Sequence, residues 1–491
     1  MSTNKHRLVR CNEKDEETLL IFKKGINDSL HQKISTWSTK KDCCAWEGVH
    51  CNNITGRVTE LHLNDQYLKG EVNLSNILEL EFLSYLDLGL NDFDVINIPA
   101  TQHNITHPSN LLYLDLFSFS SLHMVNLDWL SAHSSLKYLD LSWIDLNKET
   151  NWLQVVNTLP SLLELDLRGC KLNNFIINPS INEYLNLSSL VTLDLSHNNF
   201  TSQLPNWFFN LTKNLTYLYL HRSNIHGEIP SSLLNLHNLR VLDLSYNMLS
   251  GSIPSTLGNL SSLNSLSLGN NNFVGEISKL TFSKLSSLDS LDLASLNVVF
   301  NFDFEWVPPF QLQSLDLSNT NQGPNFPSWM YTQESLQSLD LTRSGISLVD
   351  RIKFSSLIES IPDLSLSNNS ITIDISNLTL KCQFLLMDRN NFTGGLPNIS
   401  PNVIEVDLSY NQWRRHIQVR VPGNATAYNS FSGSIPQSWK NLKELVLINL
   451  WSNKLSGEAL VHLSDWTQLS TLNLGENEFS GTIPIKMPQN L

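Results

Sequence analysis

The stretch LRVLDLSYNMLSGSIP, residues 239–254, decides the fold, because a strand pattern in it is followed by a turn pattern. Its first nine residues read L-x-x-L-x-L-x-x-N, in which apolar and polar positions alternate as in a strand with one buried face. The amide of Asn247, at position nine, is expected to bond backbone groups of adjacent repeats. The glycine and proline that follow favour a bend and then irregular structure. One such unit cannot bury its own apolar side, so the pattern predicts a stack of copies.

Seventeen copies of this pattern follow one another along the chain, most of them 24 or 25 residues apart. This spacing lies within the 20–29 residues that are typical of leucine-rich repeats. We therefore predict an α/β solenoid, a leucine-rich-repeat superhelix with one parallel strand per repeat. The first positions of the copies are 58, 83, 111, 136, 162, 190, 215, 239, 263, 288, 312, 336, 361, 382, 403, 445 and 469.

Composition and motifs exclude several classes of function. The formal net charge of −14 argues against nucleic acid as a partner, because phosphate binding needs a concentrated basic face. No Walker loop, G-x-G-x-x-G, G-x-S-x-G or H-E-x-x-H motif occurs, so we expect no enzyme activity and no cofactor. His103 and His107 have a four-residue spacing, but no further ligand is nearby in the sequence, so no metal site is expected.

The cysteines divide into a cluster and two isolated residues. The cluster lies near the N-terminus and consists of Cys11, Cys43, Cys44 and Cys51. Two adjacent cysteines are poor ligands for one tetrahedral zinc ion, so disulfides are the favoured interpretation, and they indicate an oxidising compartment. Cys170 replaces the asparagine of its repeat, and Cys382 falls on an apolar position. Both are therefore interpreted as buried structural thiols.

The first 57 residues precede the repeats. Residues 1–10 are interpreted as a leader remnant or a disordered segment, because no signal peptide is visible. Residues 11–57 are predicted to form an N-terminal cap, with a helix over 15–26 that the cysteine-rich stretch 42–51 holds on the first strand. No run approaches the roughly 18 apolar residues of a membrane span. Because the last repeat has no cap, we expect the natural protein to continue.

Two segments depart from the repeat. Removing residues 412–429 restores the normal period, so these residues are interpreted as an insertion in repeat fifteen. Repeats 1–15 then occupy residues 58–411. Residues 430–491 hold the rest of repeat fifteen and repeats 16–17, truncated at the C-terminus. The insertion is either a basic binding loop or, as we favour, an extra loop or unspliced intron sequence. The aromatic stretch 300–312 either contacts a partner or, as we favour, packs in place of a helical segment.

A candidate recognition surface follows from the repeat frame, because positions two, three, five, seven and eight are expected to face solvent. Position five is aspartate in ten repeats, which is interpreted as a device for solubility and for protection of strand edges rather than as an acidic stripe for a basic ligand. Aromatic and cationic residues also occur at the positions expected to face solvent, beginning with Tyr113 and Phe117. Such side chains either anchor a ligand or cover neighbouring strand edges. The predicted ligand-binding residues are Tyr138, Trp143, Tyr217, Tyr219, His221, Arg222, Arg240 and Tyr246.

Three motifs carry a resemblance to a known family. The cap reads C-x(n)-CC-x-W-x-G-V-x-C, the repeats carry L-x-G-x-I-P, and residues 306–329 hold WVPPFQL and FPSW. From about Cys11 to Leu491, apart from the insertion, the chain resembles the plant receptor-like proteins of immunity, especially relatives of the tomato receptors for fungal xylanase elicitor and Cladosporium effectors. The resemblance implies the plant-specific type of repeat, and it implies that Cys11 pairs with Cys43 and Cys44 with Cys51.

The resemblance also implies a function. The chain is expected to be the non-enzymatic ectodomain of a plant cell-surface receptor-like protein that binds a peptide, protein or glycan and signals through a partner receptor kinase with a leucine-rich-repeat ectodomain. Membrane attachment is expected only through a C-terminal anchor that this sequence lacks; a complete chain of this length would be secreted or apoplastic. The alternatives are a secreted inhibitor of microbial cell-wall hydrolases and a truncated, non-functional receptor fragment.

Candidate glycosylation sites among fourteen sequons are Asn53, Asn104, Asn186, Asn259 and Asn391.

Overall fold

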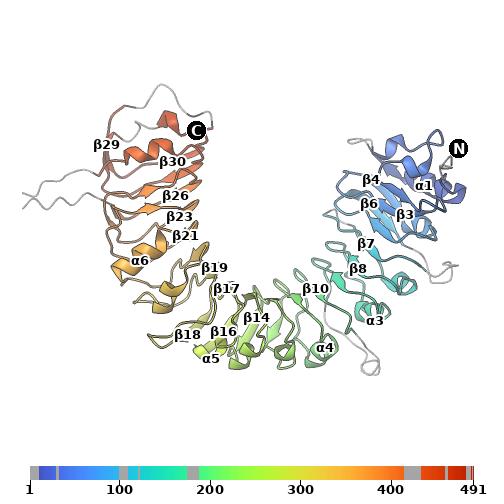
Figure 1. Cartoon of the computed structure of the whole chain (residues 1–491), viewed down its shortest axis with the longest axis horizontal. Coiled ribbons are helices and arrows are strands. Elements are labelled where there is room, and N and C mark those ends of the chain that lie inside the picture. The colour runs from blue at the N-terminus through green and yellow to red at the C-terminus, as the bar shows by residue number, and fades with distance from the viewer. Residues whose placement is uncertain are drawn as a thin grey trace, which may run out of the picture. The chain divides into compact units, whose positions relative to one another are not determined.

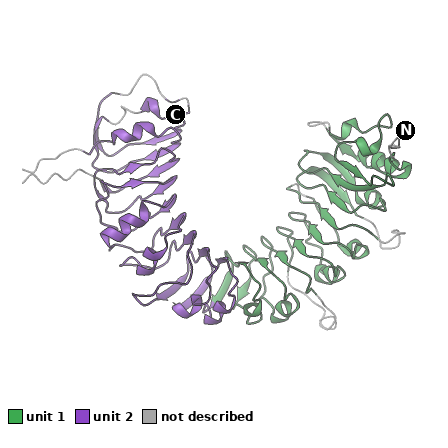
Figure 2. Cartoon of the chain, viewed as in Figure 1, with its two compact units in different colours: residues 1–250 green, residues 251–491 purple. Residues whose placement is uncertain are grey.

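The computed structural model describes residues 10–28, 33–98, 109–119, 122–173, 187–413, 433–458, 463–482, 488 and 490–491. The chain divides into two compact units, unit 1 over residues 1–250 and unit 2 over residues 251–491 (Figure 2). Residues 1–9, the histidine pair at 103 and 107, the sequons at Asn104 and Asn186, and residues 414–429 of the predicted insertion lie outside the described residues.

Each repeat of unit 1 contributes one strand to a parallel sheet, because the leucines at positions four and six are buried while the residues between them face outward. Leu242 and Leu244 are fully buried, for example, whereas the intervening Asp243 is partly exposed. Short helices lie on the other side of the repeats from the strands (Figure 1). The strands, in spatial order, are β3 (Val58–His62), β5 (Tyr85–Asp87), β7 (Tyr113–Asp115), β8 (Tyr138–Asp140), β9 (Glu164–Asp166), β10 (Thr192–Asp194), β11 (Tyr217–Tyr219) and β13 (Val241–Asp243).

Unit 2 has a parallel sheet of the same kind, whose neighbouring strands pair position for position. The predicted leucine-rich-repeat solenoid with one parallel strand per repeat is therefore confirmed. The strands of unit 2 are β15 (Ser265–Ser267), β17 (Ser290–Asp292), β19 (Ser314–Asp316), β20 (Ser338–Asp340), β21 (Asp363–Ser365), β23 (Phe384–Leu386), β26 (Glu405–Asp407), β28 (Leu447–Asn449) and β30 (Thr471–Asn473).

Short elements complete the turns. In unit 1 the helices and 3-10 turns are α1 (Glu13–Gly25), η1 (Ile34–Thr36), η2 (Cys43–Ala45), α2 (Leu74–Ile77), η4 (Asp128–Ala132), α3 (Trp152–Asn157), α4 (Asn206–Leu211) and η6 (Leu233–Asn235). In unit 2 they are η7 (Ser255–Asn259), α5 (Lys279–Phe282), η8 (Ser328–Thr332), α6 (Arg351–Ile358), η9 (Gln437–Asn441) and η10 (Leu463–Asp465).

Further strands lie outside the two main sheets. Next to the cap and the first repeats these are β1 (Ile26–Asn27), β4 (Lys69–Asn73) and β6 (Asp92–Asn97), and further along the chain they are β12 (His226–Gly227) and β14 (Met248–Gly251). The cap strand β2 (Val49–Cys51) instead joins the main sheet, where it pairs antiparallel with β3. In unit 2 the further strands are β16 (Asn272–Ser278), β18 (Asn297–Asn301), β22 (Thr379–Leu380), β24 (Thr393–Gly394), β25 (Asn398–Ile399), β27 (Gln412–Trp413), β29 (Ser456–Glu458) and β31 (Glu478–Ser480).

The asparagine at position nine bonds the backbone of adjacent repeats, as the sequence predicts. The Asn247 amide donates to the carbonyl of Leu220 in the preceding repeat at 2.8 Å and to that of Leu244 in its own repeat at 3.0 Å. Its oxygen accepts from the backbone N–H groups of Ser223 and Ile225 at 3.1 and 3.0 Å. One buried side chain therefore satisfies backbone groups that would otherwise be left without partners inside the solenoid.

The strand ends in a turn whose geometry the sequence pattern does not reveal. All ten aspartates at position five accept a hydrogen bond from the backbone N–H two residues later, as Asp115 does from Phe117 at 2.9 Å. The interpretation of these aspartates as a solubility device is therefore incomplete, because they shape the turn. Position eight then has a positive φ in sixteen of the seventeen repeats, for example +53° at Arg222.

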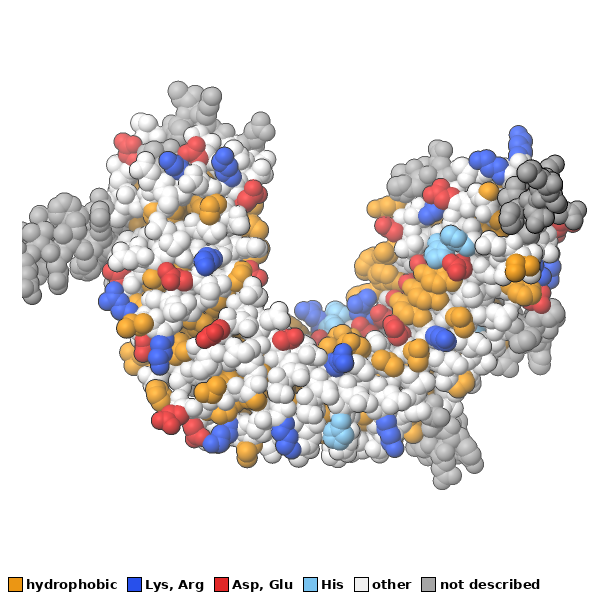
Figure 3. Space-filling model, viewed as in Figure 1, with side chains coloured by type: hydrophobic (Ala, Val, Ile, Leu, Met, Phe, Trp, Pro, Cys, Tyr) orange, Lys and Arg blue, Asp and Glu red, His pale blue; other side chains and the backbone are white. Residues whose placement is uncertain are grey.

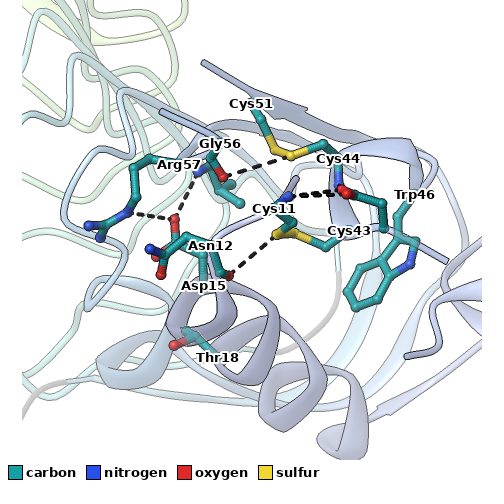
Figure 4. The surroundings of a disulfide bond; sticks show 12 residues. Cys11, Asn12, Asp15, Thr18, Cys43, Cys44, Trp46, Cys51, Gly56 and Arg57 are labelled. Atoms are coloured by element: carbon teal, nitrogen blue, oxygen red, sulfur yellow. Dashed lines mark hydrogen bonds and ion pairs between the residues drawn. A yellow bond between two sulfur atoms is a disulfide. The ribbon is translucent and has the colours of Figure 1, made fainter. Parts of the chain in front are cut away.

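The cap packs on the first repeat through Asp15 and through the pairing of β2 with β3, and two disulfides hold the cap itself together (Figure 4). The buried carboxylate of Asp15, on α1, accepts from the guanidinium Nε of Arg57 at 3.0 Å and from the backbone N–H of Val58 at 2.9 Å. A disulfide joins Cys11 to Cys43 and another joins Cys44 to Cys51, which is the pairing that the resemblance implies. Together these contacts fix α1 and the cysteine-rich stretch to β3, the first strand of the repeats.

The irregular aromatic stretch packs against its own unit. Phe302 stacks on Trp306 with ring centroids 4.5 Å apart, and both contact Trp329 of η8. Phe310 is buried, while Phe304 is 84% exposed. These contacts support the interpretation that this stretch replaces a helical segment in packing.

The two isolated cysteines are buried, as expected for structural thiols. The Cys170 Sγ donates to the carbonyl of Leu141 at 3.1 Å, and that of Cys382 donates to Ile361 at 3.2 Å. Burial raises the pKa of the Cys382 thiol to about 12, and that of Cys170 is also raised by burial. Neither thiol has the thiolate character that a nucleophile needs.

Candidate functional site

The outward face of the unit 1 sheet carries residues in rows, because the parallel strands pair position for position. Tyr85, Tyr113 and Tyr138 occupy position three of successive strands and are Cα partners in the sheet. Position five follows the same rule, so Asp87, Asp115 and the equivalent residues also lie side by side. Hydrophobic and acidic side chains gather together on this face of unit 1 (Figure 3).

The tyrosine row consists of His62, Tyr85, Tyr113 and Tyr138, stacked ring on ring. The centroids are 4.3 Å apart between His62 and Tyr85 and 4.1 Å apart between each pair of neighbouring tyrosines, whose planes are within 11° of parallel. Because the faces cover one another, the row presents ring edges and hydroxyl groups outward. All four side chains remain partly exposed.

The aspartate row runs beside the tyrosine row and consists of Asp87, Asp115, Asp140 and Asp166. Burial and then repulsion from Asp140 and Asp87 raise the pKa of Asp115 to about 7. Burial and then Asp140 and Asp194 raise the pKa of Asp166 to about 7 as well. Among the described residues, no lysine or arginine forms an ion pair with the first three aspartates. The row is therefore a set of buried or half-buried, mutually repelling carboxyl groups.

The turn row follows the strands and consists of Trp143, His197, His221, Arg222 and Tyr246. Trp143 contacts His197 at 5.4 Å between centroids, and His197 contacts His221 edge to face at 5.0 Å. The guanidinium of Arg222 lies 4.4 Å from the ring centroid of Tyr246. Trp143, Arg222 and Tyr246 hold the left-handed backbone conformation of position eight, which costs a residue other than glycine about 1–2 kcal/mol.

Charge is distributed differently in the turn row than in the aspartate row. The Nδ1 of His221 is 3.1 Å from a carboxylate oxygen of Asp243. Burial alone would raise the pKa of Asp243, but hydrogen bonds from His221 and Ser245 outweigh it and lower that pKa. Burial, His221 and Arg222 lower the pKa of His197. This half of the face therefore offers cationic and ring contacts, whereas the aspartate row offers carboxylates.

The structure places the eight predicted ligand-binding residues on this one face of unit 1. It joins Trp143, His221, Arg222 and Tyr246 in the turn row and assigns Tyr138 to the tyrosine row. The remaining three lie on or beside the last two strands: Tyr217 and Tyr219 on β11, and the exposed Arg240 just before β13.

Sequence reasoning missed three members of these rows. His197 stands at position eight of its repeat, as Trp143 and Arg222 do, and Tyr85 stands at position three, as Tyr113 does. His62 occupies position five of the first repeat. Aligning every repeat by position would have found all three.

The remaining predicted features are placed only in part. Of the glycosylation candidates, Asn53 is exposed, and Asn259 and Asn391 are half-buried. These sites stay predictions. Among the described residues, the four N-terminal cysteines form the cluster of possible metal ligands. All four are joined in the two disulfides. No helix within the described ranges is both long and apolar enough to traverse a bilayer.

Family models match two parts of the chain. A leucine rich repeat N-terminal domain matches residues 12–52, and a leucine-rich repeat region matches residues 179–351. The first match covers the disulfide-bonded cap, and the second covers repeats from both units.

Several plant proteins are similar to the chain. It is 34% identical to "Receptor-like protein EIX1" of Solanum lycopersicum, over 48% of this chain and 26% of that protein. It is 28% identical to "Receptor-like protein EIX2" of the same species, over 89% and 61%, and 30% identical to "Receptor-like protein 14" of Arabidopsis thaliana, over 96% and 50%. The chain thus spans between about a quarter and about three fifths of the length of these relatives.

Solved structures with the same fold include two receptor kinase ectodomains of Arabidopsis. The ectodomain of GASSHO1/SCHENGEN3 is 24% identical with a TM-score of 0.70, over 96% of this chain and 59% of that one. The receptor kinase HAESA, solved in complex with the peptide hormone IDA and the co-receptor SERK1, is 25% identical with a TM-score of 0.60, over 96% and 87%. With its disulfide-bonded cap and its leucine-rich-repeat solenoid, the chain is similar to the leucine-rich-repeat regions of plant receptor-like proteins.

Proposed function

We propose that this chain is the ligand-binding part of a plant cell-surface receptor-like protein, without enzymatic activity, which signals through a partner receptor kinase. The names of its relatives support a receptor, and the complex of HAESA with a peptide and a co-receptor supports a peptide or protein partner. Two disulfides in the cap fit an extracellular location.

The turn row is the observation that carries the proposal. A repeat needs only a residue that tolerates the left-handed conformation at position eight. Asparagine and serine serve there at Asn270 and Ser295, and unit 2 also has Arg343, Arg389 and Tyr410 at this position. Unit 1 places Trp143, Arg222 and Tyr246 at that position, where all three are exposed, and adds the ring contacts of His197 and His221. Exposed aromatic and arginine side chains on a rigid sheet are typical anchors of protein recognition.

The test compares the secreted chain with Arg222→Glu/Tyr219→Ala. Protein, peptide and oligosaccharide fractions of a fungal culture are each assayed for their ability to bring the chain and the SERK1 ectodomain together. We expect one fraction to promote association and the double variant to require about tenfold more of it, with an unchanged melting temperature.

The matched control is Arg343→Glu, because Arg343 is an exposed position-eight residue of unit 2 with the same backbone conformation. This control is expected to behave as the unmodified chain. The proposal fails if no fraction promotes association, or if the control weakens it as much as the double variant does.

A further inference from the structure

The tyrosine and aspartate rows have a property that folding does not require. In unit 2, Asp292, Asp316 and Asp340 stand at position five beside serines at position three, and they accept the same backbone hydrogen bonds. The turn and the strand therefore form without tyrosine next to the aspartate. The stacked rings of Tyr85, Tyr113 and Tyr138 are an addition that distinguishes three successive repeats of unit 1.

The two rows together form a surface rich in hydrogen-bond acceptors. The hydroxyl of Tyr85 donates to Asp87 at 3.3 Å and that of Tyr113 to Asp115 at 3.5 Å, so each phenol oxygen lies beside a carboxylate. Asp87 and Asp140 are only 6% and 7% exposed, and no described lysine or arginine forms an ion pair with either. Like charges held this close repel one another, and an external cation would relieve that repulsion.

We propose that the tyrosine and aspartate rows bind a basic peptide segment, whose arginine or lysine side chains bridge phenol oxygens and carboxylates. Charge complementarity selects this occupant: the surface offers acceptors and negative charge, and a guanidinium offers five donors in one plane. The strands β5 to β8 span about 10 Å at the usual strand spacing, which is room for two alternate side chains of an extended peptide, about 7 Å apart. The inference rests on the proposed function, since it names the chemistry of the ligand.

The test uses a fluorescent octapeptide of alternating glycine and arginine as the probe, with alternating glycine and glutamate for comparison. Affinity is measured by anisotropy at pH 8 and constant salt, where the carboxyl groups of Asp115 and Asp166 are ionised. The unmodified chain is expected to bind the arginine peptide and not the glutamate peptide.

Asp115→Asn is compared with Asp316→Asn as a matched pair. Both remove one negative charge at position five, and both leave an oxygen to accept the turn hydrogen bond from Phe117 or Ser318. We expect Asp115→Asn to weaken arginine-peptide binding about tenfold and Asp316→Asn to change it less than twofold. Equal weakening would mean that the peptide responds only to the net charge of the chain, and it would overturn the proposal.

Tyrosine variants test the second row. Tyr113→Ser reproduces the pairing of serine with aspartate seen in unit 2 and is expected to weaken binding about fivefold, whereas Tyr113→Phe keeps the ring and isolates the loss of the hydroxyl. Melting temperatures show whether the variants are folded. If Tyr113→Ser does not fold, binding by Tyr113→Phe and Asp115→Asn still tests whether the two rows contact the peptide. Binding of Tyr113→Ser as tight as that of the unmodified chain would exclude the tyrosine row.

This result and that of the co-receptor assay can be told apart. If the arginine peptide binds to these rows but no ligand brings the SERK1 ectodomain to the chain, the inferred ligand chemistry stands and the receptor function fails. If a culture fraction promotes association while the arginine peptide does not bind, the receptor function stands and the basic ligand is refuted.

Discussion

The asparagine at position nine has the largest structural role of any single residue in the repeat. Asn247 is buried, and its amide group serves the carbonyls of Leu220 and Leu244 and two backbone N–H groups of the preceding repeat. Nine of the seventeen repeats have asparagine at this position, and Cys170 there still reaches a carbonyl, whereas Ile144 and Leu296 fill the position in two other repeats without such bonds from their side chains.

Asn247→Ala is expected to destabilise its region by about 3 kcal/mol, because it leaves several buried backbone groups without a partner. Repeat arrays open locally, so the measurement is hydrogen–deuterium exchange of residues 215–250 rather than one global transition. The exposed Asn235, in η6, provides the control Asn235→Ala, which should leave exchange unchanged. Identical exchange in the two variants would contradict the role of Asn247.

The aspartate row makes a prediction about pH. Burial and the neighbouring Asp140 and Asp87 raise the pKa of Asp115 from 3.8 to about 7, so the folded state retains a proton that the unfolded state releases. Its contribution to stability is complete below about pH 4 and is lost as the pH rises through about 7. Asp115→Asn should therefore gain melting temperature relative to the unmodified chain between pH 5 and pH 8.

Asp243→Asn is the control for that titration. The pKa of Asp243 is lowered in the folded state, so its contribution is complete above about pH 4 and is lost only at lower pH. The difference in melting temperature for this variant should stay constant from pH 5 to pH 8. If the two variants show the same pH profile, repulsion within the aspartate row is not the cause.

At the scale of elements, the cap depends on one buried ion pair. Asp15 on α1 accepts from Arg57 and from the N–H of Val58, at the first residue of β3. Asp15→Ala leaves the buried N–H of Val58 without its acceptor and removes one of the two carboxylates that pair with Arg57, and it should cost about 3 kcal/mol, measured by exchange of residues 49–62. Glu17→Ala, which removes an exposed carboxylate from the same helix, should cost little. Equal effects would show that Asp15 does not hold the cap.

The cap also makes a prediction about its covalent bonds. Peptide mapping without reductant should find linkage of Cys11 to Cys43 and of Cys44 to Cys51, because these pairs are joined across the cap. Cys170 and Cys382 are buried in separate repeats and should remain as free thiols. A bridge to either of them would contradict the register of the repeats.

The sequence predicted the strands but not the contacts that form between repeats. The positions of the leucines and of Asn247 set the register, and the strands follow it repeat by repeat. The hydrogen bonds of the position-five aspartates and the positive φ of position eight arise from turn geometry, which alternation of apolar residues does not encode. The stacking of Tyr85 on Tyr113 depends on in-register pairing, so it could be seen only after all repeats were aligned by position.

The sequence pattern also does not predict the contact of Trp143 with Gly169. A Cβ on Gly169 would come within 2.6 Å of the Trp143 ring, so this glycine makes room for the indole of the preceding repeat. The two residues stand at position eight of neighbouring repeats, where the repeat pattern allows any residue. Only the packing of neighbouring turns shows why the turn row can include so large a ring.

At the scale of the whole molecule, the two units share a scaffold and differ in what they present. Both build parallel sheets from the same repeat, and both use aspartate at position five to form the turn. Unit 1 adds the tyrosine row, whereas three successive strands of unit 2 carry serine at position three. Both units place an arginine over a tyrosine at position eight, Arg222 over Tyr246 and Arg389 over Tyr410. We therefore propose that ligand contact falls on the strand face of unit 1 and expect the equivalent strands of unit 2 to act as scaffold.

Hydrogen–deuterium exchange of the whole chain, with and without the arginine octapeptide, tests this assignment most directly, because every described repeat reports at once. If the peptide binds to the tyrosine and aspartate rows, exchange should slow across residues 85–170, which hold β5 to β9, and should not change across the equivalent strands between residues 290 and 344. Protection spread evenly over both units, or found only in unit 2, would contradict this proposal.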